Sequence, residues 1–188
     1  MTGQNMRVFV GFSLLAVLAL GSNAVAENDS GETKLIANLT SDDPRLVTNA
    51  LDDLAARPST NAMAVARKLL SDPRPFVRKK AVRVLCAMHA PLDPDEIKAI
   101  CRMLNSYDQS EAENALKALR DLNAPETIPE ITPLLKSSHK ALVRDACRTL
   151  AVLGNKDLIP LIEPLLNHPD PGVQADARSA IASLQTRN

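Results

Sequence analysis

The 188-residue chain is 45% hydrophobic and 23% charged, a composition that supports a packed core and argues against a disordered protein. Its 22 Lys and Arg residues balance 22 Asp and Glu residues. The formal net charge of 0 therefore provides no general attraction to nucleic acid or to anionic membranes, and we expect neither as a partner. Only 2% of the residues are aromatic, so the core must be aliphatic, which suits packed helices better than a β-sandwich.

The beginning of the chain predicts export. Arg7 precedes an uncharged apolar run from Val8 to Leu20, and Ala24-Val25-Ala26 supplies the small residues of a cleavage site. We expect residues 1–26 to be a cleaved signal peptide that directs the protein to the periplasm or outside the cell. An uncleaved anchor is the alternative, but the run is shorter than the roughly 20 residues that span a bilayer. No integral membrane span is expected after removal of the signal.

The remaining chain repeats one pattern. Residues 27–32 are polar and are interpreted as a flexible leader, whereas residues 33–188 show an apolar residue followed eleven positions later by Ala and then four positions later by Leu or Ile. These spacings place the side chains on one helical face. Each unit is therefore predicted to contain a helix A, which ends at the apolar residue, and a helix B, which is centred on the Ala. The five matches are Leu39/Ala50/Leu54, Leu70/Ala81/Leu85, Leu104/Ala115/Leu119, Leu135/Ala146/Leu150 and Leu166/Ala177/Ile181.

Proline residues mark the helix boundaries. Four Asp-Pro pairs offer an N-cap carboxylate followed by Pro near the first helical position. Pro133 and Pro164 fall further inside helix A of units 4 and 5, so these two helices are expected to be kinked. The four pairs are Asp43-Pro44, Asp72-Pro73, Asp93-Pro94 and Asp170-Pro171.

The repeat resembles a known family. Ile159 to Ile181 contains Ile-Pro-Leu-Ile-Glu-Pro-Leu-Leu, His-Pro-Asp-Pro-Gly-Val and Ala-x-x-Ala-Ile, which is similar to HEAT repeats of the short type first associated with phycobilisome lyases. Ser71 to Ala81 is similar to the typical stretch between helices in that type. The resemblance implies an all-α fold, a right-handed α-solenoid of about five two-helix repeats, with the B helices on its concave side.

The third unit departs from the pattern. Glu111 occupies the position that is held by Val77, Leu142 and Val173 in other units, and the loop before this unit is longer. A small change of superhelical twist is expected here. The charged residue is interpreted either as variation in a surface loop or as a specialised contact site.

No residue pattern predicts catalysis or a cofactor. His89, His139 and His168 lie near different turns at non-equivalent repeat positions, so no metal site is predicted. The sequence also lacks a nucleophile elbow and a Gly-rich phosphate-binding loop. We therefore expect no catalytic residues, no bound metal and no cofactor.

The cysteines permit two interpretations. Cys86 and Cys101 lie on consecutive helices, and an oxidising compartment would allow a disulfide between them. Such a bond would stabilise the fold by roughly 3 kcal/mol. The alternative is that both, together with Cys147, are buried thiols that act as small apolar residues.

Helix B carries the strongest binding signal. Lys79 and Arg83 form a basic pair four residues apart in unit 2, Arg144 and Arg148 do so in unit 4, and Lys117 lies between them. Stacked units would align these five side chains into a basic ridge that could bind an acidic partner segment. The alternative is an ordinary solvated face, because acidic residues also lie there. The ridge is predicted to consist of Lys79, Arg83, Lys117, Arg144 and Arg148.

These observations predict a non-catalytic protein–protein interaction scaffold or adaptor of the periplasm or cell envelope, which binds partners on its concave face. The alternative is an enzyme, or an enzyme subunit, of the bilin-lyase class that holds a ligand in the concave groove. The low aromatic content and the signal peptide both argue against that alternative. The sequence leaves the oligomeric state open.

Overall fold

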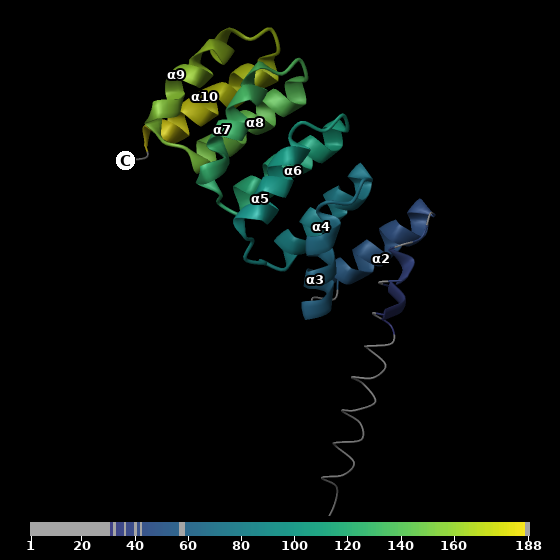
Figure 1. The fold of residues 1–188 in the computed structure, drawn as a ribbon. Helices are drawn as coiled ribbons and strands as arrows, with labels where there is room; N and C mark the ends of the chain where they lie inside the picture. Colours follow the sequence, from purple (N-terminus) through teal and green to yellow (C-terminus); the bar gives the residue numbers. More distant parts are fainter. Residues whose placement is uncertain are drawn as a thin grey trace, which may run out of the picture.

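The computed structural model describes residues 31, 33–35, 37–39, 41, 43–56 and 59–186. These residues form an all-helical α-solenoid in which each unit lies beside the previous one (Figure 1). The predicted signal peptide and its cleavage site lie outside the described residues. Within the described ranges, no helix is both long enough and apolar enough to cross a membrane.

The described residues form five helical pairs, as the repeat pattern predicts. In unit 1, residues 31, 33–35, 37 and 38 are helical and precede α2. The B helices pack against one another in chain order, α2 on α4, α4 on α6, α6 on α8 and α8 on α10. The helices of units 1 to 3 are α2 (Pro44–Ala56), α3 (Thr60–Leu69), α4 (Pro75–Ala87), α5 (Pro94–Met103) and α6 (Gln109–Asp121). Units 4 and 5 have α8 (Lys140–Leu153) and α10 (Pro171–Gln185) as their B helices.

Helix A of units 4 and 5 is divided, so the effect of the internal prolines exceeds a simple kink. In unit 4, α7 (Ile128–Ile131) is followed by the 3₁₀ helix η2 (Thr132–Lys136), which has Pro133 near its start. In unit 5, α9 (Ile159–Ile162) is followed by η4 (Glu163–Asn167) in the same way. Proline cannot donate the backbone hydrogen bond that would continue the α-helix, and the tighter 3₁₀ turn begins beside it. Each divided helix is preceded by a further 3₁₀ turn, η1 (Pro125–Thr127) in unit 4 and η3 (Lys156–Leu158) in unit 5.

The predicted caps are correct at three of the four boundaries and wrong at one. At the start of α2, the Asp43 carboxylate accepts a hydrogen bond from the Arg45 amide at 2.9 Å. Asp93 forms a capping box with Glu96, and Asp170 accepts hydrogen bonds from the first backbone amides of α10. Asp72 does not cap α4, because that helix begins at Pro75 and its N-cap residue is Arg74. The second proline sets the helical φ angle and moves the start of the helix, which leaves the Asp72 carboxylate available to Arg74.

The central Ala residues form the packed interfaces between helices. Ala50, Ala81, Ala115, Ala146 and Ala177 are each at most 1% exposed. Only a small side chain at this position allows helix B to approach its neighbours closely. The buried apolar residues form a main cluster that runs from unit 2 to unit 5 and a smaller cluster centred on α2.

Two B helices end with a residue in the left-handed conformation. His89 has φ 49° after α4, and Asn123 has φ 52° after α6. The amides of Ala90 and Ala124 donate to the carbonyls of Leu85 and Leu119, five residues back, which is the pattern of a Schellman cap. These caps turn the chain sharply at one end of the B helices, beside the groove described next.

Candidate functional site

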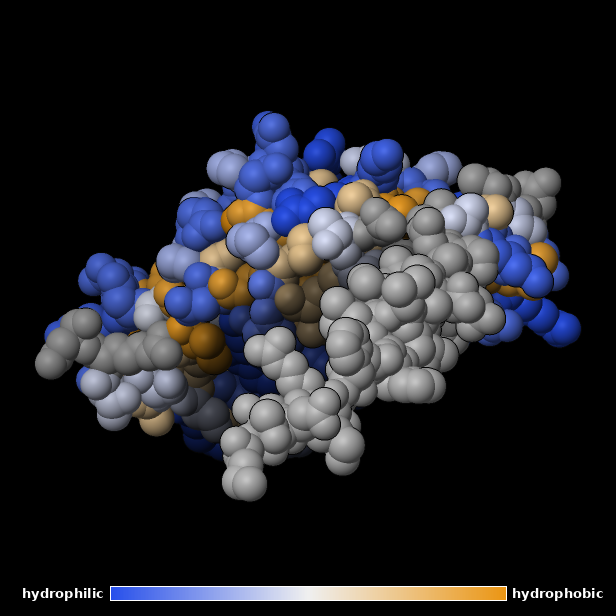
Figure 2. Space-filling model, turned by 90° about the horizontal axis from the view of Figure 1, so that it is seen from below, coloured by the Kyte–Doolittle hydropathy of each residue, from blue (hydrophilic) through white to orange (hydrophobic). Residues whose placement is uncertain are grey.

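A groove of about 780 Å³ runs along the B helices of the first three units. Its walls come from α2, α4 and α6, and the loop from His89 to Leu92 contributes one side. The lining combines apolar side chains such as Leu92 and Ile97 with charged ones. Figure 2 views the molecule from below and shows hydrophobic residues beside hydrophilic ones around a hollow. The charged lining residues are Asp52, Lys80, Arg83, Lys117, Asp121 and Glu126.

The predicted basic ridge is divided into two parts. Arg83 and Lys117 are exposed and line the groove, and neither has an ion-pair partner in the described part of the chain. The Lys79 ammonium donates to the Ser110 hydroxyl at 2.7 Å. Arg144 and Arg148 lie outside the groove lining.

Acidic residues neutralise the part of the ridge in unit 4. The Asp176 carboxylate on α10 accepts from Arg144 Nε at 2.6 Å and from Arg148 Nη2 at 2.9 Å. Arg148 Nη1 also donates to Asp145 at 3.0 Å. Arg144 and Arg148 therefore hold α8 and α10 together, whereas Arg83 and Lys117 are the ridge cations available to a ligand in the groove.

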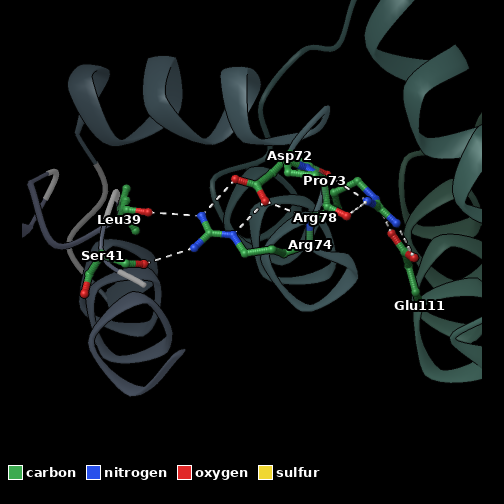
Figure 3. Close-up of polar contacts among 7 residues, drawn as sticks. All are labelled: Leu39, Ser41, Asp72, Pro73, Arg74, Arg78 and Glu111. Carbon is green, nitrogen blue, oxygen red and sulfur yellow. Dashed lines mark hydrogen bonds and ion pairs between the residues drawn. The ribbon is translucent and has the colours of Figure 1, made fainter. Parts of the chain in front are cut away.

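Arg74 connects the first two units. Its guanidinium binds both carboxylate oxygens of Asp72 at 2.9 Å. It also donates to the backbone carbonyls of Leu39 and Ser41 in the turn between the helices of unit 1, at 3.1 and 3.2 Å (Figure 3). Asp72 thus orients Arg74, and Arg74 satisfies two carbonyls that the neighbouring unit leaves without a helical partner.

Arg78 connects the second and third units through a buried ion pair. Its Nε and Nη2 atoms donate to the two carboxylate oxygens of Glu111 at 2.6 and 2.8 Å, as Figure 3 shows. Its Nη1 atom donates to the carbonyls of Asp72 and Pro73. Glu111 is 0% exposed, so the interpretation of this residue as variation in a surface loop is wrong. The contact is structural, and the signal for it in the sequence was a charge at an otherwise apolar repeat position.

The comparisons with known proteins agree with this architecture. Residues 97–184 match the family model described as HEAT repeats. The chain is a HEAT-like repeat protein. Among curated proteins, none matches it in sequence.

Solved structures with the same fold include natural and engineered proteins. The HEAT-like chain is similar over its whole length to 71% of a chain in the complex of CpcE and CpcF of phycocyanin lyase from Nostoc sp. PCC7120, with 21% identity and a TM-score of 0.66. It is similar over 87% of its length to 83% of an engineered protein, with 23% identity and a TM-score of 0.60. A designed armadillo repeat protein in complex with the peptide (KR)4 matches over 80% of each chain, with 16% identity and a TM-score of 0.56. At these identities the likeness establishes the fold alone.

The three cysteines of this HEAT-like protein are free thiols, so the disulfide considered between Cys86 and Cys101 is not formed in this structure. Cys101 and Cys147 are buried and Cys86 is half-buried. Burial raises the pKa of Cys86 and of Cys101 to about 11, and that of Cys147 to about 12. All three thiols are therefore protonated at neutral pH in this structure.

The contact between Asp72 and Arg74 is expected to weaken in acid. The hydrogen bond from Arg74 holds the pKa of Asp72 below its ordinary value of 3.8. Because the folded-state pKa is the lower one, this stabilisation is fully present above the unfolded pKa and is lost as the pH falls through the folded pKa. Asp72→Asn should therefore cost about 1 kcal/mol at pH 7, and the difference from the wild type should shrink in acid. Thermal unfolding of both proteins, followed by circular dichroism at pH 7 and at acidic pH, measures this difference in stability. A difference that is the same at neutral and acidic pH would contradict the prediction.

Proposed function

We propose that this protein is an exported, non-catalytic interaction module of the cell envelope, and that a partner protein docks in the groove formed by α2, α4 and α6. The groove itself carries the proposal, because it extends over three consecutive units and is built from side chains of the B helices. Stacked helices of this kind offer a preformed, extended surface, so a bound segment does not have to order the site first. The solenoid fold typically serves such binding.

Site-specific photo-crosslinking in the native envelope tests this function. A photoreactive residue at Ala87, which is exposed and lines the groove, should crosslink to a partner protein. The matched control is Lys98, which is exposed on α5 and lies outside the groove lining. Mass spectrometry of the product identifies the partner, and a product made of two copies of this chain would indicate self-association. Equal crosslinking at both positions, or crosslinking at Lys98 alone, would count against the groove as the binding site.

Absorbance spectroscopy separates this function from the lyase-like alternative. The similarity to the phycocyanin lyase complex, at 21% identity, concerns the fold. Protein purified from its native source is expected to be colourless above the ultraviolet range. A visible absorption band that remains with the protein through purification would instead support a ligand-holding function.

A further inference from the structure

The repeat brings two defined positions together at the interfaces between B helices. One position is two residues after the central Ala, and the other is one residue before the central Ala of the next unit. Asp52 and Lys80 occupy these positions at the first interface, and their charged atoms are 2.5 Å apart. Arg148 and Asp176 occupy them at the last interface, with reversed charges and a distance of 2.9 Å. The same geometry therefore forms an ion pair at both ends of the solenoid.

The second interface breaks this pattern. Arg83 stands at the first position, but the second position holds Asn114, a neutral amide. At the third interface, Lys117 occupies the first position and Asp145 the second, but the Asp145 carboxylate is bound by Arg148. Among the side chains that the structure describes, neither Asn114 nor Lys117 has a hydrogen-bond partner. Arg83 thus has no carboxylate at the matching position, and the carboxylate at the position that matches Lys117 is bound by Arg148 instead.

We propose that a carboxylate from the docked partner binds beside Arg83, Asn114 and Lys117, where the repeat itself leaves the two cations unpaired among the described residues. Arg83, Asn114 and Lys117 all line the groove, and Asn114 and Lys117 are three residues apart on one face of α6. Together they offer a guanidinium, an amide and an ammonium, which are all donors suited to a single carboxylate. The occupant is an extended protein segment with an Asp or Glu at this point. This inference rests on the proposed function, since it specifies the chemistry of the partner in the same groove.

The remaining charges of the groove limit the partner to an isolated acidic residue. Asp121 and Glu126 lie on the same lining and repel additional carboxylates, while Lys80 is already paired with Asp52. Apolar lining residues such as Leu92 reduce the water around a bound segment and strengthen its ion pairs. A segment with one acidic residue among apolar ones therefore complements the groove better than a polyacidic one.

A peptide-display selection against the purified protein tests the inference. Random peptides of about ten residues are long enough to follow the groove in extended form. The wild type is expected to enrich peptides that carry one Asp or Glu among apolar residues. Fluorescence anisotropy then measures the affinity of an enriched peptide and of its version with Gln or Asn at the acidic position.

The variant Asn114→Asp tests the site directly, because the new carboxylate should form an ion pair with Arg83 like the pair of Arg148 and Asp176. This variant is expected to fold normally and to bind the acidic peptide with an affinity about 10- to 100-fold lower than that of the wild type. Asn105→Asp is the matched control, since Asn105 is exposed outside the groove lining, and it should leave affinity nearly unchanged. Enrichment of peptides without acidic residues, no enrichment, or unchanged affinity in Asn114→Asp would overturn the inference. If the Ala87 crosslink persisted in such a case, the groove would still be the docking site and only its acidic specificity would be lost.

Discussion

Glu111→Ala is expected to lower the free energy of unfolding by about 3 kcal/mol, the lower end of the range for breaking a buried ion pair. The substitution leaves the Arg78 guanidinium without its counter-charge and opens a cavity at a fully buried position. The Arg78 side chain is 20% exposed, so some of its lost interaction is replaced by water. Urea denaturation followed by circular dichroism measures the change.

A double substitution provides the control for this prediction. Glu111→Leu restores the apolar residue that Leu142 and Val173 supply in other units, and Arg78→Met removes the stranded charge. The double variant should recover most of the stability, because packed apolar residues often replace a buried ion pair without loss. A loss below about 1 kcal/mol in Glu111→Ala, or a double variant as unstable as the single one, would contradict a structural role for this pair.

The single substitution Glu111→Ala should destabilise one part of the solenoid more than the rest. In a repeat protein, stability is approximately a sum of contributions from the units and from the interfaces between neighbouring units. A weaker interface between units 2 and 3 therefore destabilises the adjacent units more than the distant ones. Hydrogen exchange in Glu111→Ala is therefore expected to accelerate most in α2 and α4, on the side with the smaller apolar cluster. Uniform acceleration through α8 and α10 would show instead that the five units unfold together.

Ala146→Phe is expected to destabilise the protein by about 1–3 kcal/mol through overpacking. Ala146 is 0% exposed at the centre of α8, which packs against both α6 and α10. A phenyl ring can be accommodated there only if these helices separate or neighbouring side chains leave their preferred rotamers. The shift of the urea denaturation midpoint is the measurement. Ala182→Phe on the exposed side of α10 is the control and should have little effect, whereas equal losses would show that the central Ala has no special packing role.

The basic ridge shows how far spacing alone predicts a surface. The sequence places Lys79, Arg83, Lys117, Arg144 and Arg148 on the B helices correctly, and this follows from their fixed distance to the central Ala. The sequence does not show that Asp176 forms ion pairs with Arg144 and Arg148, because these contacts depend on how the neighbouring unit packs. The difference between a paired and an available cation is therefore a property of the packed units.

The repeat period alone determined the helical units, their small central residues and their apolar faces, because these depend on spacings within a few helical turns. The tertiary structure decided which side chains meet across the unit interfaces. The pairing of Arg78 with Glu111, and the place beside Asn114 without a carboxylate, depend on how each unit is rotated and shifted against the next. Residues about 30 positions apart share no helical period, so their contact follows only from the packing of whole helices.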